Sequence, residues 1–408
     1  MKKLKLFAFG SALALALAFA GCKTEVSPST PTEPETPTTY TVTVSSGIAN
    51  GTVTADKETA QKDETVTLTF TATDGYELDT ISVKDASNND IATTEVTSGT
   101  RYTFAMPESN VTVSATFVLL PPTFTGTAYT SLSGAHVNFG DWPQTIKAAD
   151  VTVDETKSVT VGAFTYYYGS DDAWYAKCAE NAFETGYKYS DNTDVAQASS
   201  NSTKYFKVEP IKWRVLTDNY NGKKLLLAEN ILAAHRYAAS SNNYKNSEIR
   251  EWLNGTFLGA AFTASAQSQI ATTTVDNSAR STNPDANATA WNSGNNGYAC
   301  ENTSDKIFLL SEQEMTKDGY GFAAYYVYKD DVYGTTESTR IRMTTDYAKS
   351  SGAYQSSTAG CGGWWWLRSP YYDYSSHARE VDYDGSAGNI FNVNSSQAGV
   401  VPALCIEN

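Results

Sequence analysis

The stretch CGGWWWLRSP, residues 361–370, carries the strongest fold signal in this sequence. Three consecutive tryptophans cannot all face one side of a strand, because successive side chains of a strand point to opposite faces. At least one indole is therefore expected to pack into the core while a neighbour faces the other way. Arg368 is expected to stack on an indole or to pair with a carboxylate. The segment predicts a structural anchor.

The residues that follow this anchor have a different character. Residues 371–396 are rich in Tyr, Ser, Asn and Asp. Such side chains build adaptable binding surfaces, because Tyr gives a large contact area at small entropic cost and short polar residues supply hydrogen bonds. An ordinary exposed loop is the alternative, since the whole chain is rich in the same residues. The closing GVVPAL, residues 399–404, is expected to be scaffold, with Pro402 at an edge or bulge of the last strand.

The region that contains this tail, residues 123–408, mixes apolar strands, helix and long polar loops. The segments YFKVEPIKWRVL (205–216) and KLLLA (224–228) predict a hairpin around a polar turn at 217–222. Ser247 is an N-cap residue ahead of a short amphipathic helix, 247–253, that places Ile249, Trp252 and Leu253 on one face. The Asn-, Ser- and Thr-rich segments are expected to be surface excursions: 190–203 and 271–304.

Residues 40–118 alternate Val, Thr, Tyr and Phe between Gly, Asn and Asp turns. Period-two alternation is typical of half-buried strands, so these residues predict a small all-β module. The expected strands are 40–44, 51–55, 64–73, 79–85, 101–106 and 110–117.

The N-terminus reads as an export signal. Residues 1–22 have a Lys-rich start, an apolar run from Leu6 to Ala20, and small residues before Cys22. An ordinary cleaved signal with an incidental cysteine is the alternative to acylation at Cys22. Residues 23–39 are rich in Pro, Ser, Thr and Glu, which predicts a disordered stalk.

The charge of the chain argues against nucleic-acid partners. The formal net charge is −15, with 45 acidic and 30 basic residues, and such a chain repels phosphate backbones. Four cysteines follow Cys22 without close spacing, which leaves disulfides and free thiols both open: Cys178, Cys300, Cys361 and Cys405.

No catalytic or metal motif is written in the sequence. The three histidines, His136, His235 and His377, lie outside HExxH spacing, and no GxSxG elbow or phosphate loop is present. The run Asp382 to Gly385 lacks the ligand series and the bidentate Glu of a calcium loop. We therefore expect no enzyme activity, no cofactor and no bound metal.

Several motifs resemble known bacterial families. Phe19-Ala20-Gly21-Cys22 is similar to the lipobox of lipoproteins, which implies a lipid anchor at Cys22. Residues 40–118 resemble InlB B-repeat-like modules of surface proteins, which serve as spacers or weak adhesive units. A further set of motifs resembles the domain of unknown function 6273: FG at 139–140, WPQ at 142–144, VEPIKWRVL at 208–216, WLN at 252–254, DKIFLLS at 305–311, WWLRSP at 365–370 and GVVPAL at 399–404.

This last resemblance implies an α+β C-type lectin-like fold of the formylglycine-generating-enzyme type over residues 123–408. The tail is also similar to the variable proteins of diversity-generating retroelements, a treponemal variable lipoprotein among them, which implies a diversified binding face at 371–396. Glu209-Pro210-Ile211 departs from the calcium-lectin motif, and Cys361 and Cys405 do not match the paired copper-holding cysteines of the enzymes. The expected ligand-binding residues are Tyr371, Tyr372, Asp373, Tyr374, Ser376, His377, Arg379, Asp382, Tyr383, Asp384, Asn389, Ile390, Phe391, Asn392 and Asn394.

The function expected from the sequence is a receptor or adhesin on the cell surface. It would be an exported lipoprotein of the outer membrane, touching the membrane through its lipid alone and binding an extracellular protein or glycan. A structural envelope lipoprotein without a diversified ligand is one alternative. An extracellular enzyme is the other.

Overall fold

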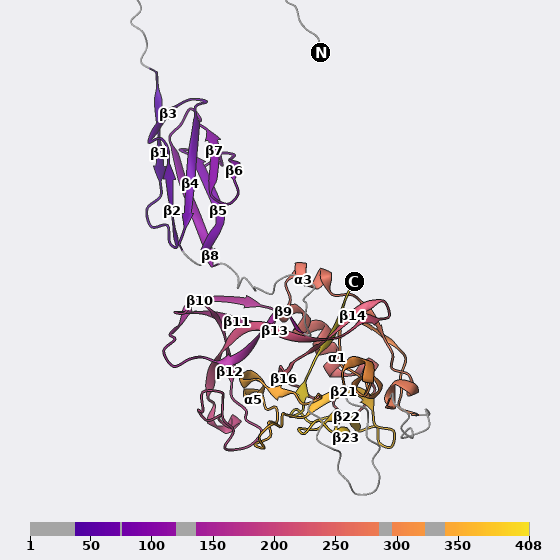
Figure 1. The fold of residues 1–408 in the computed structure, drawn as a ribbon. Helices are drawn as coiled ribbons and strands as arrows, with labels where there is room; N and C mark the ends of the chain where they lie inside the picture. The colour runs from indigo at the N-terminus through magenta and orange to yellow at the C-terminus, as the bar shows by residue number, and fades with distance from the viewer. Residues whose placement is uncertain (1–36, 74–75, 120–135, 285–295, 323–338, 408) are drawn as a thin grey trace, which may run out of the picture. The chain divides into compact units, whose positions relative to one another are not determined.

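The computed structural model describes residues 37–73, 76–119, 136–284, 296–322 and 339–407 (Figure 1). The export signal, Cys22 and most of the stalk lie outside the described residues. Contacts divide the chain into two compact units, with the main division near residue 117. The described residues are mostly β, so the expected α+β class is met only in part.

The first unit is the expected β module. Its strands form two sheets, in the orders β3-β1-β8-β5 and β2-β4-β7-β6. The side chains of Val66, Leu68 and Phe70 are at most 2% exposed, which shows the alternation that the sequence predicted. The bounds are β1 (Thr39–Val44), β2 (Gly51–Ala55), β3 (Thr59–Gln61), β4 (Thr65–Ala72), β5 (Tyr76–Asp85), β6 (Thr94–Thr97), β7 (Arg101–Ala105) and β8 (Val111–Leu119).

Two of these strands escaped the sequence analysis. β3 has three residues, and all four residues of β6 are exposed. Neither strand buries a stripe long enough to leave an alternation in the sequence.

The second unit is built on an eight-stranded sheet, which we call the long sheet. Its order is β10-β11-β12-β13-β14-β25-β19, with β9 paired to β13. The expected hairpin is present as β13 and β14, but β13 continues through Tyr220. The turn therefore shrinks to Asn221 and Gly222, whose φ angles of 54° and 82° suit these two residues. The bounds are β9 (His136–Ile146), β10 (Val153–Val161), β11 (Phe164–Gly169), β12 (Trp174–Ala179), β13 (Thr203–Tyr220), β14 (Lys223–Ala228), β19 (Ile307–Phe308) and β25 (Ala403–Glu407).

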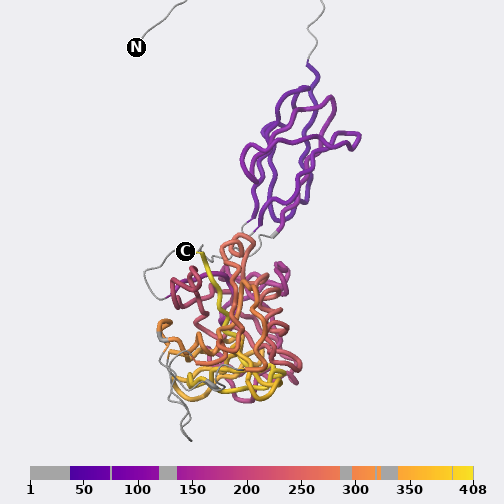
Figure 2. The backbone as a smooth tube through the Cα atoms, turned by 90° about the vertical axis from the view of Figure 1, so that its right-hand side faces the viewer, coloured from indigo at the N-terminus to yellow at the C-terminus, as the bar shows by residue number. Residues whose placement is uncertain are grey.

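A second sheet of this unit, in the order β16-β24-β21-β22-β23, carries the tail. In Figures 1 and 2 the strands after residue 360 gather at one end of the unit, except β25, which runs back into the long sheet. The bounds are β16 (Ala233–Ala234), β21 (Trp365–Pro370), β22 (His377–Val381), β23 (Ala387–Asn392) and β24 (Gly399–Val400). Two small pairs complete the strands: β15 (Asn230–Ile231) with β20 (Met343–Thr344), and β17 (Thr273–Val275) with β18 (Thr303–Asp305).

The α-helical segments are short, and a π-helical segment, Leu253–Phe257, joins α1 to α2 without a break. The helix expected after Ser247 is confirmed: the Ser247 hydroxyl accepts a hydrogen bond from the Arg250 amide, and Ile249 and Leu253 are fully buried. None of the helices among the described residues has the length and apolar character needed to cross a membrane. The bounds are α1 (Glu248–Trp252), α2 (Leu258–Ala261), α3 (Ala264–Gln269), α4 (Glu312–Met315) and α5 (Asp346–Ser350).

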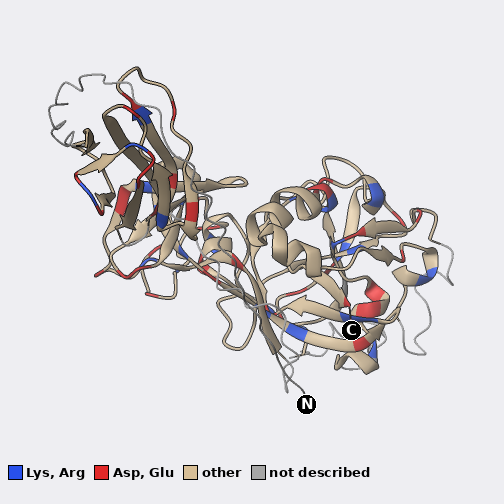
Figure 3. Cartoon of the chain, turned by 90° about the horizontal axis from the view of Figure 1, so that it is seen from above, with Lys and Arg blue, Asp and Glu red and all other residues tan. Residues whose placement is uncertain are grey.

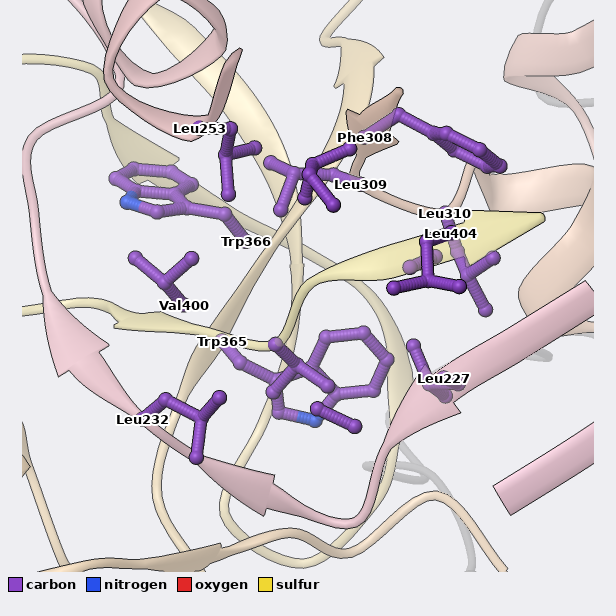
Figure 4. Packing of buried hydrophobic residues seen from close by; sticks show 14 of the residues in the cluster. Leu227, Leu232, Leu253, Phe308, Leu309, Leu310, Trp365, Trp366, Val400 and Leu404 are labelled. Carbon is purple, nitrogen blue, oxygen red and sulfur yellow. The ribbon is translucent and has the colours of Figure 1, made fainter. Parts of the chain in front are cut away.

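The tryptophan run is the anchor that the sequence predicted. Trp365 and Trp366 are both 0% exposed, and Figure 4 shows their indoles pointing in different directions among Leu227, Leu253 and other apolar side chains. Arg368 pairs with the carboxylate of Glu314. Pro402 lies between β24 and β25, where its carbonyl accepts a hydrogen bond from the Ala228 amide at 2.9 Å.

The expectation that 271–304 is a surface excursion was wrong for its first part. Asn283 is fully buried and Asn277 is 4% exposed. The side-chain nitrogens of Asn283 and Asn277 donate to the Ala279 and Glu301 carbonyls, while their side-chain oxygens are buried without a hydrogen-bond partner among the described residues. Composition alone therefore misassigned a buried segment whose side-chain nitrogens bond to the backbone.

Candidate ligand-binding surface

The predicted binding residues lie on the antiparallel hairpin of β22 and β23 and in the turns at its two ends. β22 pairs with β21 on one side and with β23 on the other, and β23 ends the order of this sheet in the described part of the chain. Because β22 runs only from His377 to Val381, the turn before it and the turn after it lie at opposite ends of the hairpin. The predicted residues are thus divided between two groups.

The first group is the tyrosine turn, which we define as Tyr371, Tyr372, Tyr374 and His377. The ring centroids of Tyr371 lie 4.8 Å from Tyr372 and 5.8 Å from Tyr374, and Tyr374 lies 5.8 Å from His377. Tyr374 is 58% exposed. Asn392 pairs with His377 across the hairpin, so both sit at this end, and Asp373 and Asn394 are exposed nearby in sequence.

A buried asparagine holds the tyrosine turn in place. The Asn242 side-chain amide is within 3.1 Å of the backbone carbonyl oxygens of Tyr371, Tyr374 and His377. The Asn242 backbone amide also donates to Ser375 at 2.7 Å. Asn242 is 1% exposed. The sequence analysis missed this residue, since nothing local marks an asparagine whose partners are about 130 residues away.

Replacement of Asn242 by alanine is expected to loosen the tyrosine turn. The change removes three side-chain hydrogen bonds to carbonyl oxygens of the turn, which costs about 1–3 kcal/mol of unfolding free energy. Urea denaturation measures this cost, and hydrogen exchange at residues 371–377 shows where it acts. Asn394→Ala, at an exposed position, serves as the control and should change stability by less than about 0.5 kcal/mol. Equal exchange rates at the turn in both variants would contradict the anchoring role.

The second group surrounds the turn between β22 and β23. The Asp382 carboxylate accepts hydrogen bonds from the Tyr383 amide at 2.7 Å and from the Asn389 side chain at 2.6 Å. Burial raises the pKa of Asp382, and the neighbouring Asp384 adds to the effect. Gly385, at φ 81°, closes the turn.

Aromatic side chains from outside the tail join this second group. Trp364 stacks on Tyr354 with centroids 4.1 Å apart and an interplanar angle of 12°. Phe391 lies 5.2 Å from Trp364, and Tyr383 lies 6.0 Å from Tyr354. All four are half-buried. Tyr354 was not predicted, because it is far from the tail's composition signal in the sequence.

Comparison with known families agrees with the division of the chain into two units. Residues 221–408 match the family described as Domain of unknown function (DUF6273). The hairpin and its anchors therefore belong to a DUF6273 domain. Residues 40–120 match the Divergent InlB B-repeat domain, which confirms that assignment of the β module. No curated protein and no solved structure matches the chain.

The matched DUF6273 region is shorter than the motifs in the sequence indicated. The FG, WPQ and VEPIKWRVL motifs precede residue 221 and fall outside the match. These motifs lie in β9 and β13, which nevertheless belong to the same sheet as the matched region. β13 pairs with β14, which lies inside the match, and with β9, which lies outside it.

Some predicted residues of the DUF6273 domain do not face solvent. Arg379 is 3% exposed, and its guanidinium carbon lies 5.0 Å from the Tyr371 ring centroid, so it supports the tyrosine turn from below. The structure therefore places Arg379 under the turn, and its ligand-binding role stays a prediction. Ile390 and Phe391 are half-buried, and Ser376 bonds to His377 at 3.0 Å.

The four cysteines after Cys22 are free thiols in the structure: Cys178, Cys300, Cys361 and Cys405. No group of three or more His, Cys, Asp or Glu side chains with metal-binding geometry occurs among the described residues.

Glu380, beside the second group, gives this domain a pH-dependent stability. It is 5% exposed, and burial together with repulsion from Asp382 raises its pKa well above the ordinary value. The folded state therefore holds a proton that the unfolded state releases, so stability falls as pH rises above about 4.3, the ordinary pKa of Glu.

We expect Glu380→Gln to remove part of this dependence. The variant should be more stable than the parent at neutral pH, and its stability should vary less between pH 4 and 8. Chemical denaturation across this range measures both effects. Glu407→Gln, whose carboxylate is 68% exposed, is the control. Parallel stability curves for the parent and Glu380→Gln would show that Glu380 titrates normally.

Proposed function

We propose that this chain is an exported surface lipoprotein whose C-terminal domain binds an extracellular protein or glycan. In this proposal Cys22 carries the lipid at the outer membrane, the B-repeat module is a spacer, and the domain has a C-type lectin-like fold. Residues 371–396 form the binding hairpin, diversified by a retroelement. Catalysis has no part in it.

One observation carries the proposal: the exposed Tyr374 and the half-buried Tyr371 and Tyr372 sit on a turn whose backbone is held by a buried residue. Tyr374 is 58% exposed, while Asn242 below it is 1% exposed and bonds to three carbonyls of the turn. A fixed backbone reduces the entropy lost on binding, and tyrosine supplies contact area at low entropic cost. Lys and Arg lie among Asp and Glu in the view of Figure 3, and the net charge of −15 does not favour nucleic acid.

Joint alanine substitution of the tyrosine turn tests this function. The variant replaces Tyr371, Tyr372, Tyr374 and His377, and Asn392 across the hairpin. Arrays of purified glycans and of extracellular-matrix proteins are probed with the parent and the variant, and thermal unfolding checks the fold. We expect the parent's strongest signals to fall at least ten-fold in the variant. Undiminished binding by a folded variant would refute the role of this turn.

The second group can be separated from the first by a matched variant. Asp382, Tyr383 and Asn389 are replaced by alanine, which leaves the tyrosine turn and Asn242 intact. If the two groups form one surface, each variant should weaken the same array signals. Loss in the first variant alone would assign binding to the tyrosine turn.

The lipid anchor is tested through Cys22. Cells that express the parent should incorporate labelled palmitate into the chain, and Cys22→Ser should abolish the label. Protease treatment of intact cells then reports display at the surface. Label retained by Cys22→Ser would refute the anchor and leave the binding proposal standing.

Diversification is tested by sequencing the gene and its flanks. A near-copy of codons 364 to 404 that differs only where the copy has adenine, beside a reverse-transcriptase gene, is the expected result. The absence of such a near-copy would refute diversification and leave the hairpin as a binding surface of fixed sequence.

A further inference from the structure

A polar pocket lies in the second unit, away from the hairpin in sequence. It has a volume of about 230 Å³. Its walls come from β9, the segment after Tyr189, the β15–β20 pair and the start of α5. The lining residues are Gln144, Thr145, Ser190, Asn230, Met343, Thr344, Thr345, Asp346 and Lys349.

A buried carboxylate fixes the walls of this pocket. Asp346 is 4% exposed and accepts hydrogen bonds from the Ile146 amide at 3.1 Å and the Ser190 amide at 2.9 Å. The Ser190 hydroxyl and the Lys349 ammonium also donate to it. The carboxylate thus ties strand β9, residue 190 and helix α5 together. Its acceptor sites are occupied, so it shapes the pocket and does not bind the ligand itself.

The lining is polar but carries no net charge. Lys349 lies 3.3 Å from Asp346, so the two charges offset each other, and the other lining residues are uncharged. The Gln144 side-chain nitrogen donates to the Glu209 and Pro210 carbonyls, which leaves its amide oxygen as an acceptor. Asn230 adds a side-chain amide, and Thr345 adds a hydroxyl that accepts from the Ala348 amide and can still donate to a ligand. Met343, 51% exposed, supplies the one apolar side chain of the lining.

These features restrict the ligand. The volume is below the range of about 300 to 1,000 Å³ found for sites of drug-sized ligands, so the occupant is small. Amides and hydroxyls that both donate and accept match a molecule whose hydroxyls do the same. The balanced charges favour a neutral molecule, because an anion or cation would lack a free counter-charge.

We infer that this pocket binds one neutral sugar residue, with Asn230, Gln144 and Thr345 bonding its hydroxyls and Met343 covering its apolar face. The inference rests on the proposed extracellular role, and it selects a glycan over a protein as the ligand of this second site. It does not depend on the hairpin.

The test measures binding of D-glucose, D-galactose, D-mannose and N-acetyl-D-glucosamine to the full chain by saturation-transfer NMR and calorimetry. At least one of these sugars should bind, and Asn230→Leu should weaken it at least ten-fold. Met343→Trp, which narrows the pocket from an exposed position, should do the same. Asn246→Leu, at an exposed position outside both the pocket and the hairpin, is the matched control and should bind as the parent does. Thermal unfolding confirms that each variant is folded.

The alternative outcomes are distinct. The absence of binding by all four sugars would overturn the inference and leave the hairpin proposal untouched. Ten-fold tighter binding of D-glucuronate than of D-glucose would overturn the neutral class. Sugar binding that survives Asn230→Leu and Met343→Trp but is lost in the tyrosine-turn variant would place the sugar on the hairpin, refuting this site and supporting the proposed function.

Discussion

Arg368→Met is expected to lower the free energy of unfolding by about 3–5 kcal/mol, because it leaves the Glu314 carboxylate buried without its partner. The two Arg368 terminal nitrogens reach both Glu314 oxygens, and they also donate to the carbonyls of Leu309 at 2.7 Å and Asp276 at 3.0 Å. Burial alone would raise the pKa of Glu314, but the adjacent guanidinium and hydrogen bonds lower it instead. Arg368 is 2% exposed, so solvent does not screen the loss.

Two variants check this explanation. Arg236→Met breaks an ion pair with Glu248 whose side chains are 49% and 35% exposed, and it should cost less than about 1 kcal/mol. Arg368→Met combined with Glu314→Gln should be more stable than Arg368→Met alone, because the amide carries no buried charge. Urea denaturation measures all three. If the exposed and buried arginine variants lose the same stability, the buried pair is not the source.

Gly363→Ala is expected to be the second strongly destabilising change. A Cβ at this position would lie 2.1 Å from the Tyr354 carbonyl oxygen and 2.5 Å from the Thr344 hydroxyl. A backbone carbonyl cannot rotate out of the way as a side chain can, so the segments that contain Gly363 and Tyr354 must move apart. Overpacking of this kind costs about 1–3 kcal/mol, and the backbone contact places Gly363 toward the upper end. Tyr354 stacks on Trp364, so the change should also disturb the second group of the hairpin.

Gly259→Ala provides the matched control. Gly259 lies in α2, and a Cβ there meets no atom within 4 Å. Alanine is the better helix former by about 1 kcal/mol, so this variant should be neutral or more stable. Thermal unfolding compares the pair, and tryptophan fluorescence follows the Trp364 environment. Gly363→Ala with parental stability and fluorescence would show that the tight packing at this glycine can relax.

The sequence alone predicted the local elements of this protein. Alternation predicted the main strands of the β module, and an N-cap serine with apolar spacing predicted helix α1. The tryptophan run predicted a structural anchor with at least one indole in the core, and Trp365 and Trp366 are both buried. Each of these signals lies within about ten residues of sequence, which is the range over which periodicity and capping act.

Only the tertiary structure decided how those elements meet. It divided the tail between two ends of a hairpin, buried Arg379, and brought Asn242 under the tyrosine turn from about 130 residues away. In the folded chain Glu314 is the partner of Arg368. The polar pocket is formed by segments about 200 residues apart in the sequence. Strand order and register set these contacts. Strand order and register depend on which faces of distant segments are buried together. A local sequence pattern does not identify the distant segment that it packs against.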